Sequence, residues 1–147
     1  MKHILLLVSI YLISFQSYGS HVVGGDFRIT MTNNIASGAY YNFQLRLFRD
    51  DVNGLATMPT SAPVGIYEIG TNTLVANVTL YQANLSLVNL GDPCYTPDPN
   101  IVRIQEGVFQ NNTPILLPNN PNGYYIQYEI FARNAIVTNI FDPGNTG

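Results

Sequence analysis

Two side chains in this sequence could act as a nucleophile and a general base: the single cysteine Cys94, and His21, the one histidine that follows the expected leader. A cysteine nucleophile needs a base within hydrogen-bonding reach, and the surroundings must hold that base in place. His21 lies close to the N-terminus expected for the mature chain, where a backbone is seldom held rigidly, and nothing in the sequence brings it near Cys94. The sequence therefore predicts no catalytic dyad.

Cys94 has no cysteine partner within the chain, so an intrachain disulfide is excluded. We favour a small, partly buried side chain, which is the common environment of a free cysteine. The alternatives are an intermolecular disulfide and a lipid attachment, although a lipoprotein cysteine would directly follow the leader.

Paired carboxylates could act as the acid and the base of a glycosidase. Asp50 and Asp51 are adjacent, so at the end of a strand their side chains point apart. Glu68, Glu106 and Glu129 lie in separate strand-like segments, where outward and solvated side chains are expected. No feature of the sequence pairs any two of these acids, and we predict that the chain is not an enzyme.

Residues 50–54 (DDVNG) carry oxygen ligands of the kind that bind calcium. Aligned on its glycine, an EF-hand loop would begin at Arg49 and end at Thr60, where the pattern requires Asp and Glu. The EF-hand pattern therefore fails. A calcium site of another geometry, built from the two aspartates and the asparagine, stays open as an alternative. We favour a simple Asn-Gly turn and predict no cofactor.

Aromatic side chains supply the remaining candidate chemistry, because the chain has 10 tyrosines and no tryptophan. Exposed tyrosine rings pack against sugars and proteins. Two adjacent pairs, Tyr40 with Tyr41 and Tyr124 with Tyr125, form the predicted ligand face. Since neighbouring residues of a strand point to opposite sides, one tyrosine of each pair is expected in the core.

Alternating apolar and polar residues indicate that strands position these side chains. Residues 26–32 and 39–49 alternate cleanly on either side of an Asn/Ser/Gly turn, which predicts a hairpin. Further strand-like segments are residues 64–69, 74–80, 84–90, 101–110, 114–117 and 124–132. The mature chain shows no helical periodicity over three turns. Short strands separated by Gly, Pro and Asn turns predict an all-β fold, an antiparallel β-sandwich of immunoglobulin-like type.

The two ends predict export and a longer parent chain. Residues 1–19 have a basic start, an apolar run too short to span a bilayer, and small residues at the end. They are typical of a signal peptide cleaved after Gly19, so residues 20–147 are expected to form a secreted single domain. Residues 142–147 have turn chemistry, and we expect the domain to be the N-terminal module of a longer protein.

Composition excludes two classes of partner. Charged residues make up only 10% of the chain, and the net charge is −3. No basic stripe is available to neutralise phosphates, so nucleic acid is not an expected partner. The mature chain has no polybasic segment for an anionic membrane surface, and we predict that it does not insert into a membrane.

Several short motifs carry a family resemblance. They are SHVVGGD at residues 20–26, LFRD at 47–50 with NG at 53–54, GYYIQY at 123–128, RN at 133–134 and DPGNTG at 142–147. In this order they resemble the N-terminal domain of large Bacteroidota cell-surface proteins. Those are gliding-motility-associated or adhesin-like proteins with PKD or immunoglobulin-like repeats, sorted by the type IX secretion system. The resemblance implies a non-catalytic structural or adhesive module that meets an extracellular protein or glycan surface.

The chain departs from that family at its cysteines. Members typically carry cysteines where this chain has residues 51–52 (DV) and 131–132 (FA), while the Pro-Cys of the proline-rich loop survives at Cys94. The resemblance therefore implies that Cys94 is what remains of a lost disulfide. The alternative function is a carbohydrate-binding module, whose exposed tyrosines would stack on sugar rings.

Overall fold

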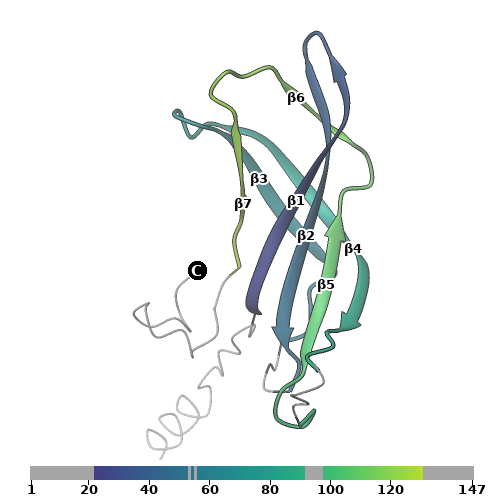
Figure 1. The fold of residues 1–147 in the computed structure, drawn as a ribbon. Coiled ribbons are helices and arrows are strands. Elements are labelled where there is room, and N and C mark those ends of the chain that lie inside the picture. The colour runs from purple at the N-terminus through teal and green to yellow at the C-terminus, as the bar shows by residue number, and fades with distance from the viewer. Residues whose placement is uncertain (1–21, 53, 55, 92–97, 131–147) are drawn as a thin grey trace, which may run out of the picture.

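The computed structural model describes residues 22–52, 54, 56–91 and 98–130 of the chain (Figure 1). Its strands are β1 (Val22–Ile35), β2 (Gly38–Asp50), β3 (Ser61–Glu68), β4 (Leu74–Leu87), β5 (Ile104–Gln110), β6 (Ile115–Pro118) and β7 (Tyr124–Tyr128). All the pairings are antiparallel, and the order across the sheet is β1-β2-β5-β4-β3-β7. The short β6 pairs with β2 beyond the end of β5.

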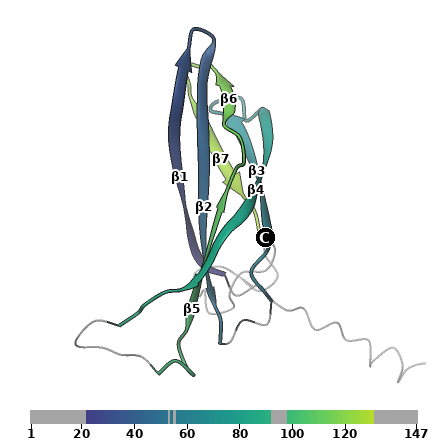
Figure 2. The ribbon, with the colours of Figure 1, turned by 90° about the vertical axis from the view of Figure 1, so that its right-hand side faces the viewer.

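The sheet curls into a half-barrel, so that its two flanks enclose one core (Figure 2). The buried cluster consists of Phe43, Leu45 and Leu47 from β2, Ala62, Val64 and Ile66 from β3, Val78 and Leu80 from β4, Phe109 from β5, Leu117 from β6, and Met58. The predicted all-β, antiparallel class is confirmed. The flanks face each other across the core as the layers of a β-sandwich do, but β4 and β5 are hydrogen-bonded and join them in one sheet.

The alternation of β2 explains its central position. Phe43, Leu45 and Leu47 point inward and are only 1–3% exposed, while the residues between them face outward. Burying an apolar side chain of this size contributes about 1.5–3 kcal/mol, so a one-residue slip of the strand would cost most of that contribution at every position. The core therefore fixes which polar side chains of β2 reach the outer face.

Four strands differ clearly from the sequence prediction. Strand β1 extends beyond the predicted residues 26–32 at both ends, and β5 begins at Ile104 and not at residue 101. The predicted segments 74–80 and 84–90 are one strand, β4, which contains a register shift between Gln82 and Asn84. A β-bulge absorbs an extra residue without ending the strand, although it interrupts the alternation. At the other end of the sheet, β7 pairs with β3 and ends at Tyr128. The predicted strand 124–132 is therefore too long at residues 129–130, while residues 131–132 lie outside the described part of the chain.

Candidate functional site

Strand β2 is paired along one edge by two strands that leave a gap between them, because β5 covers its second half and β6 its first residues. In the gap, Asn111 takes the place of a strand residue. Its Oδ1 accepts a hydrogen bond from the backbone N–H of Phe43 at 2.7 Å. Its Nδ2 donates to the carbonyl oxygen of Thr113 at 2.6 Å. The side-chain amide of Asn111 thus supplies the hydrogen bond that a neighbouring strand would otherwise give to the backbone N–H of Phe43. Residues 111–114 can therefore turn away from the sheet without leaving this N–H unpaired.

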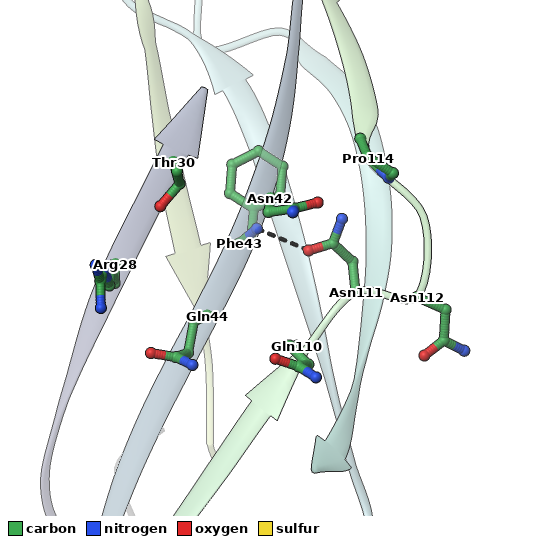
Figure 3. Close-up of a pocket in the computed structure, with 9 residues that line it drawn as sticks. All are labelled: Arg28, Thr30, Asn42, Phe43, Gln44, Gln110, Asn111, Asn112 and Pro114. Atoms are coloured by element: carbon green, nitrogen blue, oxygen red, sulfur yellow. Dashed lines mark hydrogen bonds between the residues drawn. The ribbon is translucent and has the colours of Figure 1, made fainter. Parts of the chain in front are cut away.

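This turn leaves a hollow of about 340 Å³ beside β1, β2 and the end of β5 (Figure 3). Amide and hydroxyl side chains line much of it, together with one arginine. The lining residues are Arg28, Thr30, Asn42, Phe43, Gln44, Gln110, Asn111, Asn112 and Pro114. None of them carries a carboxylate, an imidazole or a thiol. The hollow therefore offers hydrogen bonds and one positive charge, without acid–base or nucleophilic chemistry.

The strand register arranges the polar side chains of the hollow in rows. Arg28 on β1 lies opposite Gln44 on β2, which lies opposite Gln110 on β5. Thr30 and Asn42 face each other in the next row. Neighbouring strands are about 4.8 Å apart, so the three-strand row is about 10 Å wide. That width suits a ligand of one or two sugar rings or a short peptide.

Arg28 carries a charge that no carboxylate among the described residues neutralises. The other described arginines are paired, Arg46 with Asp26 and Glu106, and Arg49 and Arg103 with Asp51. Asp26 precedes Arg28 by two residues, but Nε and Nη2 of Arg46 bind its carboxylate at 3.0 and 2.7 Å. The hydrogen bond and the charge of Asp26 raise the pKa of Arg46. Arg28 therefore remains available to an anionic ligand.

Of the four predicted tyrosines, Tyr40 lies beside the hollow. It borders an open depression with Thr32, Asn33 and Pro114, and Pro114 also lines the hollow. Tyr125, on β7, does not line the hollow. Its ring stacks on that of Tyr67 with centroids 5.2 Å apart and planes inclined by 14°. The four side chains therefore do not form one continuous face.

Tyr41 and Tyr124 line a second groove at the open side of the half-barrel, to which both edge strands, β1 and β7, contribute residues. Both tyrosines pack against the core and line this groove of about 300 Å³ together with Ile29 and Ile126. The hydroxyl of Tyr124 donates to the carbonyl oxygen of Pro118 at 2.9 Å. Ile29 is 53% exposed, because β1 is the last strand of the sheet on this side. This groove is more apolar than the hollow and contains no described charged side chain.

The aspartates of the suggested calcium loop have protein partners. Oδ1 of Asp51 accepts a hydrogen bond from Nη2 of Arg49 at 2.9 Å, and its Oδ2 accepts one from Nε of Arg103 at 2.7 Å. Oδ1 of Asp50 accepts from the backbone N–H of Val52 and closes the turn. Both oxygens of Asp51 are thus occupied by guanidinium groups. Within the described ranges, no group of three or more metal-binding side chains gathers.

The glutamates considered for glycosidase chemistry have separate partners. The carboxylate of Glu68 accepts hydrogen bonds from the side chains of Thr71 and Asn120. Oε1 of Glu106 lies 3.6 Å from Nη1 of Arg46. The carboxylate of Glu129 accepts a hydrogen bond from the amide of Gln127. Residues 1–19, His21, Asn53 and Cys94 lie outside the described part of the chain. In that described part, no helix is long and apolar enough to cross a membrane.

The chain matches no protein-family profile, no curated protein and no solved structure. Its candidate site therefore stands on the geometry of the hollow.

Proposed function

We propose that the chain is a non-catalytic, extracellular, structural or adhesive module of a bacterial surface protein, and that it attaches to a glycan or protein surface through the hollow. The observation that carries this proposal is the lining of the hollow, in which amides, a hydroxyl and an arginine converge without a carboxylate, a histidine or a cysteine. Such a set binds a polar ligand by hydrogen bonds and has no group that could transfer a proton to it.

The sequence supports the extracellular part of the proposal. Residues 1–19 are typical of a signal peptide. The short motifs between residues 20 and 147, taken in order, resemble N-terminal domains of Bacteroidota surface proteins that are sorted by the type IX system. A low charge content and a surface rich in amides and tyrosines are compatible with attachment to other cells or to their matrix.

The carbohydrate-binding alternative has one specific observation in its favour. Tyr40 borders a depression that adjoins the hollow, so an aromatic ring and a set of amides lie on one surface. Aromatic side chains combine a large apolar face with a polar tip, which is how they contact sugars. Tyr41, Tyr124 and Tyr125 lie away from this surface and are not needed by this alternative.

The test measures attachment of the purified chain, coupled to beads, to surfaces coated either with bacterial surface polysaccharide or with outer-membrane protein. The variant Asn42→Ala/Gln44→Ala removes two outward amides but keeps the inward residues of β2, so its fold should persist. The matched control Thr79→Ala/Gln127→Ala removes two exposed polar side chains from β4 and β7.

We expect the hollow variant to lose attachment by about tenfold or more, because each lost hydrogen bond is worth about 1 kcal/mol. The control should attach as well as the unchanged chain. Equal attachment of all three proteins would place the binding surface elsewhere, and hydrolysis of the polysaccharide by the purified chain would contradict a non-catalytic role.

A further inference from the structure

The outer face of the β1–β2 hairpin has an uneven charge distribution. Asp26 and Arg46 lie opposite each other and form an ion pair, whereas Arg28 lies opposite the uncharged Gln44. The chain as a whole is acidic, with a net charge of −3. Among the described residues, Arg28 has no carboxylate partner and the hollow is lined by no carboxylate, so this arginine is a local exception that favours a ligand with a negative group.

The groups next to Arg28 suit a ligand with many hydroxyls. Gln44, Gln110, Asn42 and Asn112 each carry an amide, which offers two donor hydrogens and an acceptor oxygen. A sugar hydroxyl both donates and accepts, so it pairs with such a group in either direction. Asn111, in contrast, is already engaged by the backbone of Phe43 and holds the wall of the hollow in place.

The hollow and the depression beside Tyr40 lie next to each other along β2, so their side chains follow one another in a fixed order. Along β2, outward residues recur at every second position, so Tyr40, Asn42 and Gln44 follow one another at about 6.7 Å intervals. Tyr40 stands at one end, and the row that contains Arg28 at the other. A linear ligand along β2 would therefore meet an aromatic ring first, then amides, and finally a positive charge.

We propose that the hollow binds an acidic oligosaccharide, with a uronic-acid carboxylate on Arg28, ring hydroxyls on the amides of Asn42, Gln44 and Gln110, and a neighbouring sugar ring against Tyr40. This inference rests on the proposed function and specifies its ligand. A planar guanidinium binds a carboxylate with two parallel hydrogen bonds, and such charge-assisted bonds are about twice as strong as neutral ones.

The experiment titrates the purified chain with trigalacturonic acid and, in parallel, with its methyl ester, which keeps the hydroxyls but removes the charge. Isothermal titration calorimetry gives the affinities, and amide chemical shifts of β1 and β2 locate the binding. The variants are Arg28→Gln, Arg28→Lys and Tyr40→Ala, and the control is Gln127→Ala on β7. The acid should bind, Arg28→Gln should weaken it by about tenfold, and the Lys variant should retain part of the affinity. Raising the salt concentration to about 1 M should weaken binding of the acid, because it shortens the screening length from about 8 Å to about 3 Å, the separation of a contact ion pair.

The outcomes separate the ligand class from the proposed function. If the acid and the ester bind equally and Arg28→Gln changes nothing, the acidic inference is wrong, while attachment through the amides persists. If neither saccharide binds but the chain still attaches to the protein-coated surface through Asn42 and Gln44, the ligand is a protein and the saccharide inference is overturned. If the hollow variants alter no attachment at all, both proposals fail together.

Discussion

Asp51 and Arg103 are joined twice, by their backbones and by their side chains. The backbone N–H of Asp51 donates to the carbonyl oxygen of Arg103 at 2.8 Å, and Nε of Arg103 donates to Oδ2 of Asp51 at 2.7 Å. The other carboxylate oxygen accepts from Arg49, whose residue is only 8% exposed. The turn after β2 is therefore fixed to the chain just before β5 by a partly buried ion pair network.

Replacing this carboxylate should be costly. Asp51→Asn would leave the buried guanidinium of Arg49 without a countercharge, and we expect the free energy of unfolding to fall by about 2–3 kcal/mol. Asp26→Asn breaks an ion pair of the same chemistry whose side chains are 45% and 43% exposed, so water screens it and its loss should lower the free energy of unfolding far less. Urea unfolding of both variants measures the difference, and equal losses would contradict the structural role given to Asp51.

Asn111 should have a larger effect on stability than its neighbour in the same turn. Asn111→Ala removes the acceptor of the Phe43 N–H, which would cost about 1–2 kcal/mol and speed hydrogen exchange at that amide. Asn112→Ala changes an exposed side chain and should alter stability by less than about 0.5 kcal/mol. If hydrogen exchange at the Phe43 amide were unchanged in Asn111→Ala, a group other than Asn111 would have to accept the hydrogen bond of that N–H.

Gly38 permits the close approach of β6. A Cβ at this position would collide with the carbonyl oxygen of Leu117 and lie 2.9 Å from the Cα of Pro118. Because backbone atoms cannot easily move away, Gly38→Ala should cost about 1–3 kcal/mol and detach β6 from β2. Gly24→Ala is the matched control, since nothing lies within 4 Å of its added Cβ. Thermal unfolding of the two variants tests this, and similar melting temperatures would contradict the packing argument.

Alkaline pH should weaken the fold through Tyr128. Burial raises the pKa of this phenol above its ordinary value of 10.0, because the core disfavours the phenolate. Well below pH 10.0 the phenol is protonated in both the folded and the unfolded chain, so its full contribution to the free energy of unfolding is present. Above that value the unfolded chain loses its proton first, and stability falls as pH rises until the folded phenol also ionises. Tyr128→Phe should reduce this loss in urea unfolding across the alkaline range, whereas a pH dependence identical to that of the unchanged chain would contradict it.

Export is tested at the N-terminus of the mature chain. We expect cells that express the full sequence to release a protein beginning at Ser20, as measured by intact-mass spectrometry. Gly19→Leu places a bulky residue directly before the cleavage point and should block processing. A released chain that keeps residues 1–19 would contradict the signal-peptide prediction.

The sequence predicts the faces of β2 better than it predicts their neighbours. The alternation of Phe43, Leu45 and Leu47 with polar residues identifies both the core and the outward positions of Asn42 and Gln44. Alternation says nothing about which strand lies alongside. The row of Arg28, Gln44 and Gln110 depends on the pairing of β1, β2 and β5, which only long-range contacts determine.

The hollow was not predicted for the same reason. Its wall depends on Asn111, whose side chain bonds to Phe43 across 68 positions of sequence. In the sequence, residues 111–113 look like an ordinary polar loop between the strand-like segments 101–110 and 114–117. The tyrosine pairs were a clear local signal, but the curl of the sheet separates Tyr40 from Tyr124 and Tyr125 and leaves only Tyr40 near the hollow.

At the gap between β5 and β6, the residues that could vary to change ligand binding are not the residues that stabilise the core. In most folds these two requirements conflict. Residues 111–114 contribute no side chain to the buried cluster, and only Asn111 is needed to close the ladder. The three residues that follow it could change in type or number while the core stays as it is. Related chains could therefore acquire different ligand preferences by exchanging this short segment, in the way that antibody loops diversify on a constant framework.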